Sequence, residues 1–153
     1  LREKIFENIW VQPASGDAGG ALGSALSVWY LHKKNKRQNF SHTDTMKGAY
    51  LGPKFTDNEI RKSLIDCGAK FETLNEELII NKTAEVLSEG KAVDWFQNRM
   101  EFGPRALGSR SILADPRSEK MQKELNLKIK FRESFRPFAP SILEEEKKLW
   151  SVG

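Results

Sequence analysis

Arginines gather in one short stretch of the sequence, residues 98–117, which reads NRMEFGPRALGSRSILADPR. Its four arginines stand among glycines and prolines, which do not suit the regular face of a helix or a strand. A guanidinium group stays charged at any physiological pH and forms paired hydrogen bonds with the oxygens of phosphate or carboxylate. The stretch therefore predicts a loop that holds a large anion.

A second group of cations lies downstream, in the segment NLKIKFRESFRPFAP. If KFRESFRP is extended, every second side chain points to one face, which aligns Lys130, Arg132, Ser134 and Arg136. Each charge-assisted hydrogen bond contributes roughly 1.5–3 kcal/mol, so three or four of them could hold a triphosphate or a pair of anionic substrates. We expect the two groups of cations to fold toward one pocket.

Two other interpretations of these cations stay open. The arginines could form structural ion pairs with Glu101, Asp115 and Glu133. Basic residues interleaved with aromatic ones are also typical of proteins that bind single-stranded nucleic acid. In an extended strand, however, Phe131 and Phe135 would face away from the cations, so we predict that these rings pack in the core.

A third segment, VQPASGDAGGALGSAL, joins a loop of small residues to an apolar helix. Amide groups at the start of a helix point toward a bound phosphate, and glycine lets a ligand approach the backbone. Asp17 stands where this helix begins, and it could cap the helix or bind a metal that bridges nucleotide phosphates. The glycines could instead reflect close packing of the helix against a neighbour.

The elements that must position these residues alternate between helix and strand, which predicts an α/β fold. Capping-box spacing of Thr56 and Glu59 predicts the start of a helix, and Gly68 and Gly90 predict two helix ends. The expected helices cover residues 21–35, 55–68, 75–91 and 118–130, and the chain stops in a further helix start after residue 143. The expected strands cover residues 5–13, 92–97 and 109–115, and residues 136–143 are expected to be extended.

The composition is ordinary for a soluble globular protein, with 39% apolar and 30% charged residues. No apolar run approaches the roughly 20 residues that a membrane helix needs, so we expect no membrane partner. Cys67 is the only cysteine, which excludes an intrachain disulfide and suits a cytoplasmic protein. With only two histidines, a self-contained histidine metal site is not expected. Because the chain begins at Leu1, we expect it to be a segment of a longer protein.

On the three segments quoted above, the chain resembles the O-carbamoyltransferase family that includes nodulation protein U and antibiotic-tailoring carbamoyltransferases. The resemblance implies that residues 1–39 are the end of an actin-like ATPase-type domain, that residues 40–49 are a connector, and that residues 50–153 are a truncated YrdC-like α/β domain. It implies an enzyme that makes carbamoyladenylate from carbamoyl phosphate and ATP, with Mg²⁺. The carbamoyl group then passes to the hydroxyl of a small-molecule or sugar acceptor, beside a metal that is iron where assigned.

The resemblance also implies roles for single residues. Asp17 matches the aspartate that helps to ligate the metal, and the nucleotide-proximal loop matches Gly16, Gly19 and Gly20. The catalytic basic motif, which binds the oxygens of ATP and carbamoyl phosphate, matches Lys130, Arg132 and Arg136. The other basic loop supplies phosphate contacts from Arg99 and Arg105.

The sequence departs from the family pattern at Asp94, Asn98 and Ser109, where a small residue, glycine and asparagine are expected. The histidine pair of the metal site is expected upstream of Leu1, so this segment alone should be inactive. Threonylcarbamoylation of tRNA is an alternative, because both domain types occur there and the chain is basic, with a net charge of +4. A non-catalytic nucleic-acid-binding module is the other alternative.

Overall fold

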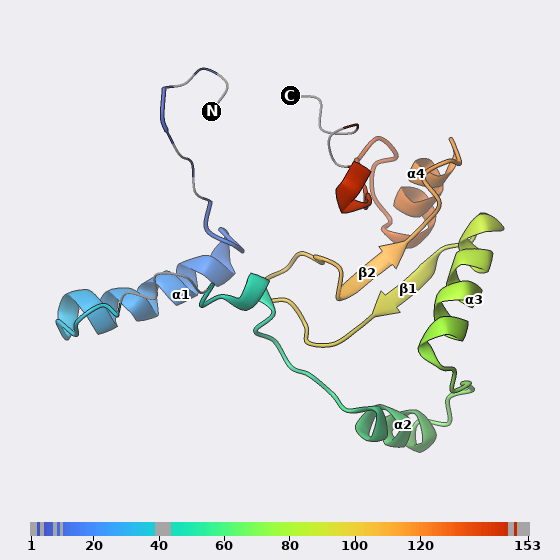
Figure 1. The fold of residues 1–153 in the computed structure, drawn as a ribbon, viewed down its shortest axis with the longest axis horizontal. Coiled ribbons are helices and arrows are strands. Elements are labelled where there is room, and N and C mark those ends of the chain that lie inside the picture. The colour runs from blue at the N-terminus through green and yellow to red at the C-terminus, as the bar shows by residue number, and fades with distance from the viewer. Residues whose placement is uncertain are drawn as a thin grey trace. The chain divides into compact units, whose positions relative to one another are not determined.

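The computed structural model describes residues 3, 5–7, 9, 11–38, 44–146 and 149. This part of the chain contains both helices and strands, as the predicted α/β class requires, but β1 and β2 follow one another directly instead of alternating with helices (Figure 1). The helices are α1 (Asp17–Ser27), α2 (Asp57–Asp66), α3 (Glu76–Ser88) and α4 (Met121–Glu124). Two short elements are π-helices, η1 (Val28–His32) and η3 (Leu125–Ile129). Two others are 3-10 helices, η2 (Lys47–Ala49) and η4 (Glu144–Glu146). The strands are β1 (Val93–Phe96) and β2 (Arg110–Leu113).

Local signals set the ends of α2 and α3. The Thr56 side chain accepts a hydrogen bond from the Glu59 amide, and the Glu59 carboxylate accepts one from the Thr56 amide, so the predicted capping box is confirmed. Asn75 caps α3 by accepting a hydrogen bond from the Leu78 amide. Gly68 and Gly90 follow the two helices with positive φ angles of 68° and 77°. These left-handed conformations end the helices as predicted.

The pair of strands brings the two ends of the arginine-rich stretch together. β1 and β2 form one two-stranded sheet, and their arrows point in opposite directions (Figure 1). The connecting loop, residues 97–109, therefore leaves the sheet and returns to it at the same end. Its first and last residues are hydrogen-bonded, since the Gln97 amide donates to the Ser109 carbonyl at 3.0 Å. Both predicted strands in this region are confirmed.

The chain divides into two compact units, which are described separately. The first unit contains residues 1–72 and 95–111, and the second contains residues 73–94 and 112–153. In the first unit, residues 49–53 lie against residues 100–102. The Gly52 amide donates to the Met100 carbonyl at 2.9 Å, and the Phe102 amide donates to the Ala49 carbonyl at 2.6 Å. The predicted boundaries at residues 39 and 50 stay predictions.

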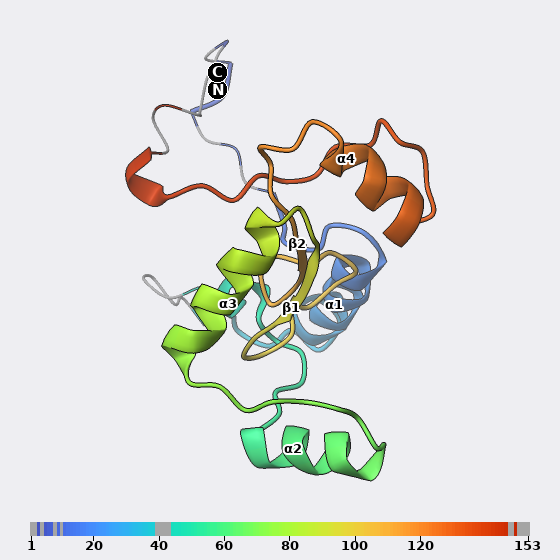
Figure 2. The same cartoon turned by 90° about the vertical axis from the view of Figure 1, so that its right-hand side faces the viewer.

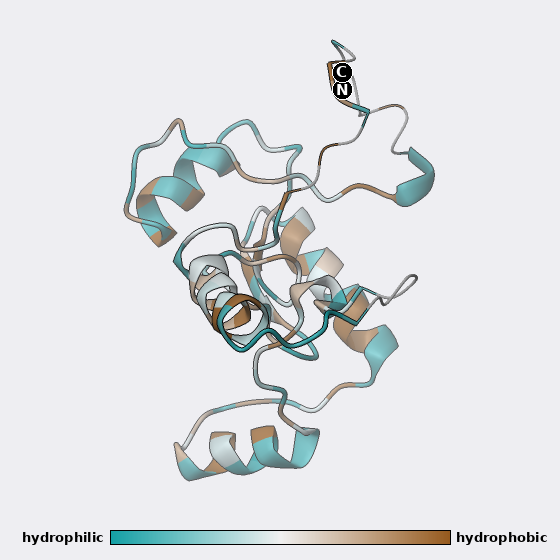
Figure 3. Ribbon diagram, turned by 90° about the vertical axis from the view of Figure 1, so that its left-hand side faces the viewer, coloured by the Kyte–Doolittle hydropathy of each residue, from teal (hydrophilic) through white to brown (hydrophobic). Residues whose placement is uncertain are grey.

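Helix α4 continues directly into η3, and the coil is followed by a reversal of the chain (Figure 2). Met121 and Leu125 are buried on this coil, as helical spacing predicted. Helix α2 is mostly hydrophilic, with apolar bands between its polar parts (Figure 3). In the described residues, no helix combines the length and apolarity needed to cross a membrane.

Buried side chains are few, and half of them are polar. The buried apolar residues in the described part are Ala49, Met121 and Leu125, and the buried polar residues are Glu101, Ser109 and Asn126. Burying a polar group is costly unless it is hydrogen-bonded. In the described residues, no fully buried side-chain nitrogen or oxygen lacks a partner. Hydrogen bonds to these polar side chains therefore organise the two units.

Three sequence-based expectations are wrong. Residues 5–7, 9 and 11–13 form no strand, while residues 8 and 10 lie outside the described part. Segment 130–137 is a turn rather than an extended strand, because Phe131 has a positive φ of 47° and the Arg136 amide donates to the Glu133 carbonyl. Phe131 and Phe135 are 85% and 77% exposed, so they do not pack in a core.

Candidate anion-binding site

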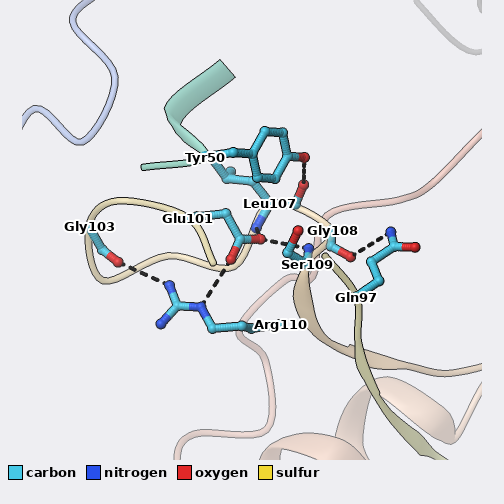
Figure 4. A network of polar contacts seen from close by, with 8 residues as sticks. All are labelled: Tyr50, Gln97, Glu101, Gly103, Leu107, Gly108, Ser109 and Arg110. Carbon is cyan, nitrogen blue, oxygen red and sulfur yellow. Dashed lines mark hydrogen bonds and ion pairs between the residues drawn. The ribbon is translucent and has the colours of Figure 1, made fainter. Parts of the chain in front are cut away.

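Glu101 organises the loop that carries the predicted phosphate-binding arginine Arg105. Its side chain is fully buried, and one carboxylate oxygen accepts hydrogen bonds from the amides of Leu107 and Ser109, both at 2.7 Å (Figure 4). The other oxygen accepts from the Arg110 Nε at 3.0 Å. Arg110 also donates from Nη2 to the Gly103 carbonyl, which closes the loop on itself. The loop is therefore shaped by an internal carboxylate.

The protonation of Glu101 follows from these contacts. Burial by itself raises the pKa of the carboxyl group, because it disfavours the charged form. Hydrogen bonds from the backbone amides of Leu107, Glu101 and Ser109, and from the Arg110 side chain, outweigh burial and lower the pKa to about 2. Glu101 is therefore ionised at neutral pH and pairs with Arg110.

The ion-pair alternative holds for three of the arginines. Arg110 pairs with Glu101, Arg117 pairs with Asp115 at 2.6 Å, and Arg136 pairs with Glu133 at 2.9 Å. Hydrogen bonds from Arg117 lower the pKa of Asp115 to about 2. A backbone hydrogen bond within Glu133, followed by the charge of Arg136, lowers the pKa of that glutamate. Arg110 therefore serves the loop structure, and Arg117 serves a turn after β2. Arg136 is exposed and pairs through its Nε, and its terminal nitrogens have no partner among the described residues.

Arg99 lies in an open pocket of the first unit, with a volume of about 560 Å³. Lys47 and Lys54 line the same pocket, and its lining contains no aspartate or glutamate. The Arg99 Nη1 donates to the Gly52 carbonyl at 2.5 Å, which fixes one end of the guanidinium. Three cations around an open, carboxylate-free hollow create a positive potential that suits phosphate oxygens.

Two of the departures from the family pattern line this pocket, Asn98 and Ser109. Asn98 has a φ of 54°, a left-handed conformation that favours glycine and that asparagine tolerates better than most residues. Asparagine at this position therefore keeps the backbone conformation that glycine would allow. Ser109 is buried and is held by Glu101. The third departure, Asp94, lies exposed in β1.

The small-residue loop meets the arginine-rich loop within the first unit. A Cβ added to Gly103 would stand 2.6 Å from the Ala14 Cβ, so the two backbones are in close contact. Gly19 donates its amide to the Ala14 carbonyl at 2.8 Å, and a Cβ on Gly19 would stand 2.4 Å from that oxygen. Gly19 is therefore required by close backbone packing. Gly16 and Gly20, by contrast, have open space beside them.

Asp17 is the first residue of α1 and is exposed. The residue that caps the helix is Gly16, and no side chain provides a capping hydrogen bond, so the capping role proposed for Asp17 is wrong. No group of three or more His, Cys, Asp or Glu side chains suited to a metal occurs in the part of the chain that is described. The predicted metal role of Asp17 stays a prediction. Arg105 is exposed on the loop.

In the second unit, the cations of the predicted catalytic motif lie on the turn after η3. Lys130 and Arg136 are exposed and Arg132 is half-buried. The Arg132 guanidinium stacks on the Phe138 ring, with its central carbon 5.0 Å from the ring centre. Its Nε donates to the Asn126 side-chain oxygen at 2.7 Å. The predicted convergence of this motif with the Arg99 loop stays a prediction.

Sequence reasoning missed four residues that shape these features. Three of them belong to a turn-rich segment with no periodic pattern, so nothing in the sequence connected them with Arg99: Lys47, Tyr50 and Lys54. Tyr50 donates from its hydroxyl to the Leu107 carbonyl at 3.1 Å. Asn126 did carry a signal, because it is a polar residue next to the apolar positions Met121 and Leu125 of a helical segment.

Comparisons with known proteins identify relatives of the chain. Residues 84–152 match the family model described as "Carbamoyltransferase C-terminus". The chain is 55% identical over 148 residues to an uncharacterized protein of Synechocystis, covering 95% of this chain and 24% of that protein. It is 42% identical over 147 residues to nodulation protein NolNO of Sinorhizobium fredii, covering 95% of this chain and 21% of the relative. With nodulation protein U of Rhizobium fredii it shares 36% identity over 141 residues, covering 92% and 21%. The chain thus spans about a quarter of the length of these relatives.

Proposed function

We propose, because residues 84–152 match the family model described as "Carbamoyltransferase C-terminus", that the chain is part of an ATP-dependent O-carbamoyltransferase. Carbamoyl phosphate, ATP and water would give carbamoyladenylate, phosphate and pyrophosphate. The carbamoyl group would then move from the adenylate to the hydroxyl oxygen of a small molecule or sugar, with release of AMP and of the hydroxyl proton. On this proposal, residues 1–39 end an actin-like domain, and residues 50–153 belong to a YrdC-like domain that forms the adenylate.

The observation that carries the proposal is the pocket around Arg99. Its lining combines Lys47, Lys54 and Arg99 with polar side chains and has no carboxylate. Carbamoyl phosphate and ATP are both anions, so bringing them together needs positive charge to reduce their mutual repulsion. A pocket of about 560 Å³ has the size of an ordinary small-ligand site. We assign this pocket to phosphate groups of the substrates.

Asp17 is the one residue of this chain that we propose as a metal ligand. Its carboxylate is exposed at the start of α1, beside the open space at Gly16 and Gly20, which leaves room for an ion. No group of three or more suitable side chains occurs among the described residues, so we propose that further ligands come from other parts of the full-length protein. A bound metal would polarise an oxygen of the carbamoyl group or of the acceptor as a Lewis acid.

The test is exchange of labelled pyrophosphate into ATP by the full-length enzyme, with and without carbamoyl phosphate. Lys54→Ala removes a pocket cation, and each lost charge-assisted hydrogen bond should raise the KM for a phosphate-bearing substrate roughly tenfold or more. Lys62→Ala is the matched control, because this exposed lysine of α2 pairs with Asp66 and does not line the pocket. We expect the control to keep the wild-type KM.

The outcomes separate the candidate reactions. Carbamoyl-phosphate-dependent exchange that Lys54→Ala weakens and Lys62→Ala leaves intact supports the proposal. Absence of such exchange in the wild-type enzyme contradicts it. Exchange that needs threonine and bicarbonate in place of carbamoyl phosphate would favour threonylcarbamoylation of tRNA.

Exposed aromatic rings favour a second candidate, binding of single-stranded nucleic acid. Phe131 and Phe135 are 85% and 77% exposed and alternate with Lys130, Arg132 and Arg136. Bases stack on such rings while the cations contact the phosphates. Titration with a single-stranded oligonucleotide at two salt concentrations tests this function, since phosphate contacts make affinity fall steeply as salt rises. Absence of saturable binding at low salt would eliminate it.

A further inference from the structure

Asn126 is the centre of the hydrogen bonds that shape the cationic turn of the second unit. It lies in η3 with no exposed surface. Its side-chain oxygen accepts from the Arg132 Nε at 2.7 Å. Its side-chain nitrogen donates to the carbonyls of Ser134 and Arg136, at 3.1 and 2.8 Å. One amide group thus holds both a guanidinium and the backbone that follows it.

The turn needs these donors because it has no partner strand. Residues 130–137 form neither helix nor strand, so their carbonyl groups need hydrogen bonds from side chains or water. Asn126 also accepts at its backbone carbonyl from the Arg132 amide, at 3.0 Å. Gln122, one turn earlier, donates to the carbonyls of Phe135 and Arg136 at 3.2 and 3.1 Å. Two side chains of one helical coil therefore anchor the turn.

The contacts of Arg132 hold one edge of its guanidinium, at Nε, and leave the other edge, with the two terminal nitrogens, available to a ligand. Asn126 binds Nε, and the Phe138 ring lies under the guanidinium plane. The two terminal nitrogens of Arg132 donate no hydrogen bond and form no ion pair within the described part of the chain. Two parallel N–H groups at this edge match the spacing of two phosphate oxygens. The orientation of that edge depends on Asn126, because the bond to Nε fixes rotation about the end of the side chain.

We propose that Asn126 is a positioning residue that presents Arg132 and the turn 130–136 to a phosphate-bearing substrate. The proposal rests on the function proposed above, and it names a residue that would not itself touch the substrate. A buried asparagine suits this role because one planar group both accepts from a cation and donates to carbonyls. Aspartate would keep only the first of these functions, and alanine would keep neither.

Kinetics of the full-length enzyme test the positioning role. Asn126→Ala should raise the KM for ATP or carbamoyl phosphate roughly tenfold or more. Asn126→Asp, which still accepts from the Arg132 Nε, should raise it less. The matched control is Asn75→Ala, which removes the cap of α3 in the same unit and should leave KM unchanged. In an Arg132→Lys background, Asn126→Ala should have a clearly smaller effect, because the two residues act through one contact.

Hydrogen–deuterium exchange of residues 130–136 gives a second readout that does not need activity. Exchange should accelerate in Asn126→Ala and Asn126→Asp, which both lose the bonds to the Ser134 and Arg136 carbonyls, and should stay at the wild-type rate in Asn75→Ala. If the wild-type enzyme is active and the KM of Asn126→Ala lies within twofold of the wild-type KM, the proposal is overturned. If the wild-type enzyme shows no ATP–pyrophosphate exchange, the proposed function fails. Unchanged deuterium uptake in the turn of Asn126→Ala would then overturn the anchoring role as well, and faster uptake would support it.

Discussion

Gly103 and Ala14 lie so close together that a Cβ on Gly103 would stand 2.6 Å from the Ala14 Cβ. Both residues have positive φ angles, 100° for Gly103 and 53° for Ala14. Their contact joins the loop before Asp17 to the loop that carries Arg105. Two segments that the sequence places about ninety residues apart thus share one packed surface within the first unit.

Gly103→Ala should therefore separate the two loops. The added methyl group meets Ala14 and also strains the backbone, so we expect lower activity in the full-length enzyme as well as lower stability. Gly108→Ala is the matched control: its φ of 110° imposes similar strain, but the nearest atom, the Tyr50 hydroxyl oxygen, is 3.9 Å away. Pyrophosphate exchange and thermal unfolding measure both variants. Equal losses in the two would show that the contact with Ala14 has no role of its own.

Glu101→Gln should loosen the arginine-rich loop. The glutamine oxygen can still accept from both amides, but as a neutral and weaker acceptor. Its NH₂ group would face the Arg110 Nε, so the bond that ties Arg110 to the loop is lost, at a cost of roughly 1–3 kcal/mol. Hydrogen exchange of the Leu107 and Ser109 amides, which donate to Glu101, should accelerate accordingly. Asp66→Asn, which breaks the exposed pair with Lys62, should leave these amides unchanged. If the Leu107 and Ser109 amides of Glu101→Gln exchange at the wild-type rates, the hydrogen bonds to Glu101 do not hold the loop.

Acid should weaken the same loop through Glu101. The folded state lowers the pKa of this group from 4.5 to about 2, so its ionisation contributes stability above pH 4.5. That contribution is lost as the pH falls through the interval from about 4.5 to about 2. Protection of the Leu107 and Ser109 amides, measured across this interval, should fall in the wild type and vary much less in Glu101→Gln. If the wild type and Glu101→Gln lose amide protection over the same pH range, titratable groups other than Glu101 cause the acid sensitivity.

Phe131→Gly should stabilise the chain slightly. Phe131 is 85% exposed and has a φ of 47°, a left-handed conformation that costs a residue with a side chain roughly 1–2 kcal/mol. Glycine removes that strain and loses little buried surface. Phe135→Gly is the control, since Phe135 is also exposed but has no positive φ, and glycine there should not stabilise. Thermal unfolding compares the two, and a lower midpoint for Phe131→Gly would indicate that its ring packs against something.

Local elements could be predicted from the sequence because neighbouring residues determine them. The capping box of Thr56 and Glu59, the glycines after α2 and α3, and the apolar spacing of Met121 and Leu125 all act within one or two helical turns. The two strands around the arginine-rich stretch were predictable for the same reason. The similarity to carbamoyltransferases was also recognisable, since the motifs are long continuous stretches of sequence.

The conformation of KFRESFRP was not predictable from alternation, because the period of two applies only to an extended backbone, and this segment turns at Phe131 and at Glu133–Arg136. Here Asn126 supplies the hydrogen bonds that a strand would have supplied, and the segment turns back on the helical coil. That arrangement left Phe131 and Phe135 exposed, against expectation.

The sequence by itself determined α2, α3 and the two strands, how its cations are grouped, and which family its motifs resemble, since these properties depend on residues close together in the chain. Only the tertiary structure decided which cations stay available for a ligand: Arg110 pairs with the buried Glu101, while Arg99 shares a pocket with Lys47 and Lys54. The physical reason is that a cation's role depends on the acceptors and charges around it in space, and distant segments bring most of these together.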